Sequence, residues 1–284
     1  MSIGIYFDDS DYAKQWRGPE KVARNLIKGL EMFNIEYLIN QDGDYNIILQ
    51  NCERLKANLS NCFLGPNICT LPIDNQFLMS YDNYIKAIVP SDWIKSKYSR
   101  WIPENKIEVW PSGIDTDVWI DTTDFEKEYD FLIYFKRREL DEVIKIQQFL
   151  IERNKTFYTI QYGNYSEQDF LYIISKCKYA FIIDGCESQG LAIQEIMSCN
   201  LPVIVWDKIE WTDRGDEFKF SATSVPYFNN DCGLKFDKMS DLENTYNLFL
   251  SCKYNSRQYI VDNLSIKSST QKILKIINEN NKQS

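Results

Sequence analysis

Short apolar runs alternate with amphipathic segments along the first half of the chain. Residues 3–7 form an apolar run that predicts a strand, and residues 18–33 carry apolar side chains at helical spacing. Further elements are expected as strands at residues 35–39, 45–50, 87–89 and 107–110 and as a helix at residues 91–98. Strands that alternate with helices predict a parallel sheet with both faces covered.

The same alternation restarts after residues 121–128, a polar segment without apolar periodicity. The elements expected there are strands at residues 129–135, 157–162, 179–183 and 202–206 and helices at 139–150, 167–176, 241–252, 256–264 and 266–278. We therefore expect an α/β fold with two doubly wound, Rossmann-like domains, residues 1–122 and 123–265. A C-terminal helix in residues 266–284 is expected to pack back on the first domain. Such sheets bind ligands beyond the carboxyl ends of their strands, so two facing domains would form one interdomain cleft.

The composition of the chain narrows the classes of partner. Of its 284 residues 44% are hydrophobic, so it can bury substantial cores, and its net charge of −9 argues against binding to nucleic acid. No apolar run approaches the about 20 residues of a membrane-spanning helix, and the first residues do not resemble a signal peptide. We therefore expect a soluble cytoplasmic protein, for which peripheral contact with a membrane stays open.

Several common kinds of active site are excluded or disfavoured. The chain contains no histidine, which rules out an imidazole base, a Ser-His-Asp triad and a histidine-ligated metal. Its eight cysteines form no CxxC pair and no clustered zinc spacing, so reduced thiols are expected. Asp42-Gly43-Asp44 has the form of a metal-binding D-x-D motif, but a turn between strands is the simpler interpretation. No bound metal is expected.

Residues 186–197 carry the pattern that is most informative about chemistry. Glu187 and Glu195 stand eight positions apart with Gly190 between them, after one apolar strand and before another. A helix that begins near Gly190 would point its first N–H groups at the space beside Glu187, which favours an anion. Two acids at such a helix end suit a ligand with both phosphate and sugar hydroxyls. The alternatives are a capping acid for Glu187 and a solvated helix carboxylate for Glu195.

A basic cluster, Lys136-Arg137-Arg138, directly follows the apolar run 129–135. Fixed cations at the end of a strand could stabilise the charge of a departing diphosphate without a metal. A solvated run of charges is the alternative.

Four stretches, in this order along the chain, resemble family-4 retaining glycosyltransferases with the GT-B fold. Gly18-Pro19 with the following helix is similar to the N-terminal glycine loop of that family, and residues 110–115 are similar to the end of its N-terminal domain. Residues 136–138 lie where the family has a basic phosphate-binding pair, and residues 187–204 resemble its E-x7-E signature. The chain departs from the family in its single first-loop glycine, its three adjacent cations and its lack of histidine.

The resemblance implies roles for these residues. Glu187 would contact hydroxyls of the transferred sugar, and Lys136 and Arg137 would neutralise the leaving diphosphate. Glu195 would accept hydrogen bonds from the ribose of the donor nucleotide. The further donor-binding residues implied are Gly18, Arg138, Ser188, Gln189, Gly190 and Leu191.

The function implied is that of a retaining, metal-independent glycosyltransferase without a cofactor. It would move a hexosyl or pentosyl group from a nucleotide-diphospho-sugar to a glycan, a lipid-linked acceptor or a small-molecule hydroxyl. One alternative is a sugar-nucleotide 2-epimerase, although such enzymes resemble a family that uses an active-site histidine. The other alternative is a non-catalytic protein that binds a sugar nucleotide or a glycan.

Overall fold

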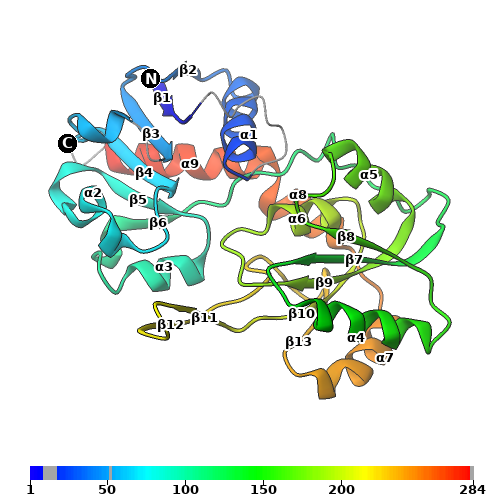
Figure 1. The fold of residues 1–284 in the computed structure, drawn as a ribbon. Helices are drawn as coiled ribbons and strands as arrows, with labels where there is room; N and C mark the ends of the chain where they lie inside the picture. Colours follow the sequence, from blue (N-terminus) through cyan, green and yellow to red (C-terminus); the bar gives the residue numbers. More distant parts are fainter. Residues whose placement is uncertain (9–17, 51–52, 282–284) are drawn as a thin grey trace. The chain divides into compact units, whose positions relative to one another are not determined.

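The computed structural model describes residues 1–8, 18–50 and 53–281 of the chain. The chain divides into two compact units, and the first of them is discontinuous in sequence. The first unit comprises Met1–Asp115 and Leu264–Ser284, and the second comprises Thr116–Asn263. Each unit contains a parallel sheet with helices on its faces, so each is a Rossmann-like α/β domain (Figure 1).

The first unit is built on a six-stranded sheet in the order β2-β1-β3-β4-β5-β6, and its strand pairs are parallel. Its strands are β1 (Ser2–Tyr6), β2 (Glu36–Ile39), β3 (Tyr45–Gln50), β4 (Cys62–Asn67), β5 (Lys86–Val89) and β6 (Ile107–Val109). Strand β4 was not predicted, because its apolar residues are few and it contains Gly65-Pro66, a pair that is typical of turns.

The helices of the first unit come from both ends of the chain. They are α1 (Gly18–Met32), α2 (Gln76–Met79), α3 (Asp92–Tyr98) and α9 (Ile266–Asn281), with short 3-10 helices η2 (Glu53–Lys56), η3 (Pro72–Asp74), η4 (Tyr81–Asn83) and η5 (Glu104–Lys106). Helix α9 packs beside α1 (Figure 1). It is tied to the end of the sheet, where the Trp110 indole donates to the Ser269 carbonyl at 3.0 Å and Ile114 bridges Ser265.

The second unit is built on a five-stranded parallel sheet in the order β13-β10-β9-β7-β8. Its strands are β7 (Tyr129–Lys136), β8 (Phe157–Gln161), β9 (Cys177–Asp184), β10 (Val203–Trp206) and β13 (Gly233–Phe236). Its helices are α4 (Leu140–Ile151), α5 (Glu167–Ser175), α6 (Leu191–Ser198), α7 (Leu242–Ser251) and α8 (Ser256–Leu264), with the 3-10 helix η6 (Met239–Asp241).

Successive side chains of β7 and β9 point to opposite faces of this sheet. Phe131 and Phe181 pack in one core with α4 and α7, whereas Tyr134 meets Phe170 of α5 on the other face, with ring centroids 5.8 Å apart. Figure 1 shows the same layering, with α4 and α7 below the sheet and α5, α6 and α8 above it.

Two features of the second unit differ from the sequence prediction. Strand β13 was not predicted; Gly233 begins it with φ +145°, and any Cβ there would collide with the Val203 carbonyl of β10. The hairpin of β11 (Glu210–Asp213) and β12 (Phe218–Ser221) was not predicted, because its strands are short and charged. No helix in the described part of the chain has the length and hydrophobicity to cross a membrane.

Candidate functional site

The carboxyl edge of the second sheet gathers the loops that follow β7, β9 and β10. Lys136 and Asp184 end their strands side by side in the register of the ladder. The Gly185 N–H then donates to the Lys136 carbonyl at 3.0 Å, which joins the two loops just beyond the strands. Since parallel strands end at one edge, the residues that follow them lie close together whatever their separation in sequence.

Lys136, Arg137 and Glu187 meet at this edge. Lys136 Nζ and Arg137 Nη2 each lie 2.6 Å from the same oxygen, Oε1 of Glu187. The side chains of Glu187 and Lys136 are 8% and 14% exposed, whereas that of Arg137 is 59% exposed. Two cations around one carboxylate give the cluster of Lys136, Arg137 and Glu187 a net positive charge, which favours binding of an anion.

The backbone of Arg137 makes this convergence possible. Successive side chains of a strand point to opposite faces, so Lys136 and Arg137 would diverge if β7 continued. Arg137 instead adopts φ +53°, a left-handed conformation that is costly for a residue with a Cβ. The chain turns there, and both side chains reach Glu187. A strained residue at such a place is typical of a functional site.

The loop from Glu187 to Gly190 leads into α6. The Glu187 N–H donates to the Thr223 carbonyl at 3.0 Å, and the Gln194 side chain donates to the Gln189 carbonyl at 2.6 Å, so both ends of the loop are fixed. Gly190 is the N-cap with φ +79°, a conformation that favours glycine. The N–H groups of the first turn of α6, starting at Leu191, have no partners within the helix and can bind an anion.

The buried side of the site contains carboxyl and hydroxyl groups. Glu195 of α6 is 3% exposed. Burial raises the pKa of Tyr165, which shares a hydrogen bond with Tyr134, and the carboxylates of Glu195 and Asp184 raise it further. These side chains therefore lie within electrostatic reach of one another, on the face of the sheet that α5 covers.

Asp184 is a site residue that the sequence analysis missed. It is 1% exposed, and burial together with the neighbouring Glu187 carboxylate raises the pKa of Asp184 to about 8, against the opposing effect of Lys136 and Arg137. Its position in the sequence could have identified it as a site residue. An acid that ends an apolar run and precedes a glycine lies at the carboxyl edge of a parallel sheet, where ligands bind.

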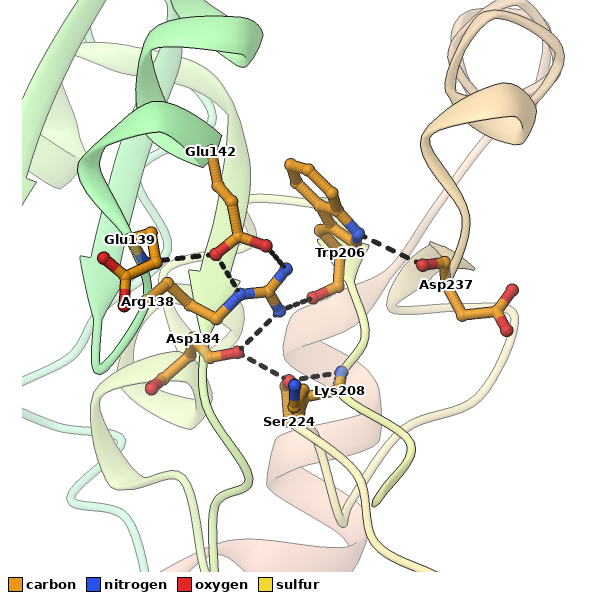
Figure 2. Close-up of polar contacts among 8 residues, drawn as sticks. All are labelled: Arg138, Glu139, Glu142, Asp184, Trp206, Lys208, Ser224 and Asp237. Atoms are coloured by element: carbon orange, nitrogen blue, oxygen red, sulfur yellow. Dashed lines mark hydrogen bonds and ion pairs between the residues drawn. The ribbon is translucent and has the colours of Figure 1, made fainter. Parts of the chain in front are cut away.

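Arg138 faces a different set of partners from Arg137. Its guanidinium forms a paired contact with Glu142 at 2.7 and 2.5 Å, and Nη1 donates to the carbonyls of Asp184 and Trp206 at 3.2 Å each (Figure 2). It also lies 4.9 Å from the centre of the Trp206 ring. Its hydrogen bonds thus connect the ends of β9 and β10 to the start of α4.

The loops around the hairpin are tied to the same edge. Asp207 accepts hydrogen bonds from the Thr223 hydroxyl and the Ser224 N–H at 2.8 and 2.7 Å and pairs with Lys235 at 2.9 Å. The Ser224 hydroxyl donates to the Asp184 carbonyl at 2.9 Å and accepts from the Lys208 N–H (Figure 2). The hairpin base is therefore part of the framework that holds Glu187.

The remaining sequence candidates lie elsewhere. Gly18 begins α1 in the first unit, and the loop before it, residues 9–17, lies outside the described residues. Asp42 accepts hydrogen bonds from Tyr6 and Arg54, and Asp44 accepts from the Ser2 N–H, so the D-x-D acids have separate partners. Among the residues described, no group of three or more Cys, Asp or Glu side chains is arranged to hold a metal.

Comparison with known proteins yields similarity in structure alone. No protein-family model matches the chain, and no curated protein matches its sequence. The structure of a lipopolysaccharide outer core galactosyltransferase, WaaB, is similar with a TM-score of 0.63 and 12% identity over 98% of this chain and 99% of that chain. Sucrose-phosphate synthase from Thermosynechococcus elongatus is similar with a TM-score of 0.60 and 12% identity over all of both chains. The chain therefore has the GT-B fold, which confirms the predicted fold class of two Rossmann-like domains.

Proposed function

We propose that the protein is a retaining glycosyltransferase that uses a nucleotide-diphospho-sugar. The observation that carries this proposal is the shared contact of Lys136 and Arg137 with buried Glu187 at the carboxyl edge of the second sheet. The names of the two structurally similar proteins, a galactosyltransferase and a sucrose-phosphate synthase, support sugar transfer as the reaction class.

The diphosphate of the donor would bind Lys136, Arg137 and the first N–H groups of α6. Glu187 lies 2.6 Å from the charged nitrogens of both cations. A diphosphate that binds these cations would compete with Glu187 for them and free its carboxylate to accept hydrogen bonds from the sugar. Each charge-assisted hydrogen bond of this kind contributes about 1.5–3 kcal/mol.

The rest of the donor would extend along the loop and α6. Glu195, buried one turn into the helix, would accept hydrogen bonds from the ribose hydroxyls. The loop residues Ser188, Gln189, Gly190 and Leu191 would contribute backbone N–H groups.

The chemistry would rest on stabilisation of the leaving group. Cleavage of the sugar–phosphate bond places an additional charge on the departing diphosphate, and Lys136 and Arg137, held by Glu187, would stabilise that charge. The acceptor hydroxyl would attack from the face that the diphosphate leaves, and the diphosphate would take its proton. This route requires no histidine, in keeping with the sequence. Neither a metal nor a cofactor is part of the proposal.

Two further assignments complete it. Arg138 positions the site without touching phosphate, because its guanidinium is engaged by Glu142 and two carbonyls. The first unit would bind the acceptor, which is a glycan, a lipid-linked sugar or a small-molecule hydroxyl, and Gly18 stays a predicted contact of the donor.

A panel of UDP-, GDP-, ADP- and CDP-sugars tests the proposal. A donor present at about 100 times its Kd should add about 2.7 kcal/mol of stability, which a thermal shift detects. With the donor so identified and an acceptor mixture added, release of nucleoside diphosphate should persist in EDTA, and the product should keep the anomeric configuration.

A matched pair of variants assigns the activity to the site. Glu187→Gln should abolish transfer, whereas Asp130→Asn, at the start of β7, should leave it unchanged. Conversion of the donor to its 2-epimer, binding without turnover, or no binding of any sugar nucleotide would each refute the proposal.

A further inference from the structure

Asp184 ends β9 inside the candidate site, and the donor contacts proposed above do not use it. Its side chain is 1% exposed, and Oδ1 accepts no hydrogen bond from any described residue. Its backbone carbonyl faces Arg138 and Ser224, and its side chain extends to the other side (Figure 2). A buried carboxylate oxygen without a donor is strongly disfavoured, whereas a protonated carboxyl is not.

The charges around Asp184 do not compensate for its burial. Lys136, its neighbour on β7, and Arg137 are both in contact with Glu187, so their charge is shared with a second carboxylate. The ionisable groups that surround Asp184 are Tyr134, Lys136 and Arg137 at the end of β7, Glu187 in the following loop, and Tyr165 before α5, beyond which lies Glu195 of α6.

This setting favours the neutral acid at pH 7. Burial, followed by the charge of Glu187, raises the pKa of Asp184 to about 8, although Lys136 and Arg137 act in the opposite direction. A diphosphate on the two cations would bring more negative charge, which would favour the protonated form further.

We propose that Asp184 is a proton-carrying member of the diphosphate subsite, whose O–H donates a hydrogen bond to the bound ligand and whose ionisation expels that ligand. The inference rests on the proposed donor site for its location. It adds that diphosphate binding is linked to one proton held by the protein.

Binding of UDP and of inorganic pyrophosphate at pH 7.5 and 9.5 tests this linkage by calorimetry at constant ionic strength. If only protein with Asp184 protonated binds, affinity of the wild type should fall about 25-fold between these pH values. Asp184→Asn keeps the shape and a hydrogen-bond donor but cannot ionise, so this fall should be absent beyond what the titration of the ligand itself causes.

Asp130→Asn is the matched control. Asp130 lies at the other end of β7, where it pairs with Lys178 at 2.9 Å, so this variant should retain the fall in affinity. A second measurement needs no ligand. The infrared band of a protonated carboxyl should be present in the wild type at pH 6, disappear by pH 9.5, and be absent from Asp184→Asn.

The possible outcomes separate the inference about Asp184 from the proposed function. Lack of the infrared band, or an equal fall in affinity in the wild type and Asp184→Asn, overturns the inference. Binding of both ligands without pH dependence overturns it and leaves the proposed function standing. Proton-linked binding of pyrophosphate without binding of UDP supports Asp184 and refutes UDP as the leaving group of the proposed donor. If neither ligand binds, the inference is wrong and UDP is excluded as the leaving group.

Discussion

Asp184→Asn should change how the stability of the protein depends on pH. The pKa of Asp184 is raised from an ordinary value of 3.8 to about 8, so between these values the folded protein holds a proton that the unfolded chain has lost. A group of this kind contributes stability that is fully present below pH 3.8 and is lost as pH rises through about 8. The asparagine variant lacks this dependence.

The size of the effect follows from the proton count. A difference of one bound proton changes the free energy of unfolding by about 1.4 kcal/mol per pH unit. Between pH 5 and pH 7 the wild type should therefore lose about 2.7 kcal/mol relative to Asp184→Asn. Urea denaturation of both proteins at several pH values, followed by tryptophan fluorescence at constant ionic strength, measures this difference.

Asp130→Asn provides the contrast. Burial opposes ionisation of Asp130, but Lys178 and the Thr156 N–H outweigh it and lower its pKa, so its contribution is present above its ordinary pKa and is lost as pH falls. The difference between the wild type and Asp130→Asn should therefore be flat from pH 5 to 7. A flat difference for Asp184→Asn as well would refute the reasoning about burial.

Three further predictions concern the charged residues of the site. Glu195→Gln should weaken UDP binding about tenfold or more in calorimetry, because an ionised acceptor becomes a neutral one; unchanged affinity would contradict the ribose assignment. Arg138→Ala should lower the free energy of unfolding by about 2–4 kcal/mol in urea denaturation, since it removes the cationic donor that Glu142 and two carbonyls share. A loss below about 1 kcal/mol would show that the network is not structural. Arg137→Ala should change stability by less than about 1 kcal/mol, because Arg137 is largely exposed, but should lower kcat strongly; wild-type kcat would exclude its proposed role at the diphosphate.

The architecture was predictable because its signals are local. Apolar runs of strand length recur between helical patterns, and the edge at which their loops meet follows from the parallel arrangement. Strands β4 and β13 were missed because Gly65, within β4, and Gly233, the first residue of β13, resemble turn residues until the neighbouring strand is known.

The site was only partly predictable because its chemistry depends on packing. Sequence presents Arg137 and Arg138 as equivalent cations, and the left-handed turn at Arg137 sends them to different partners. The residue type alone does not predict this conformation of Arg137. Asp184 was missed for a related reason, since the burial that changes its ionisation comes from elements distant in sequence.

Because the chain returns to its first unit at the C-terminal end, the two units become able to fold at different times during synthesis. The second unit is continuous, so everything it needs has left the ribosome once residue 263 has emerged. The first unit must wait for α9, because Ile114 pairs with Leu264 and Ile266, and the Trp110 indole bonds to Ser269. Nascent chains cut after residue 115 would therefore expose the surface that α9 covers. The second unit, which contains Glu187, can complete its fold before the first unit does.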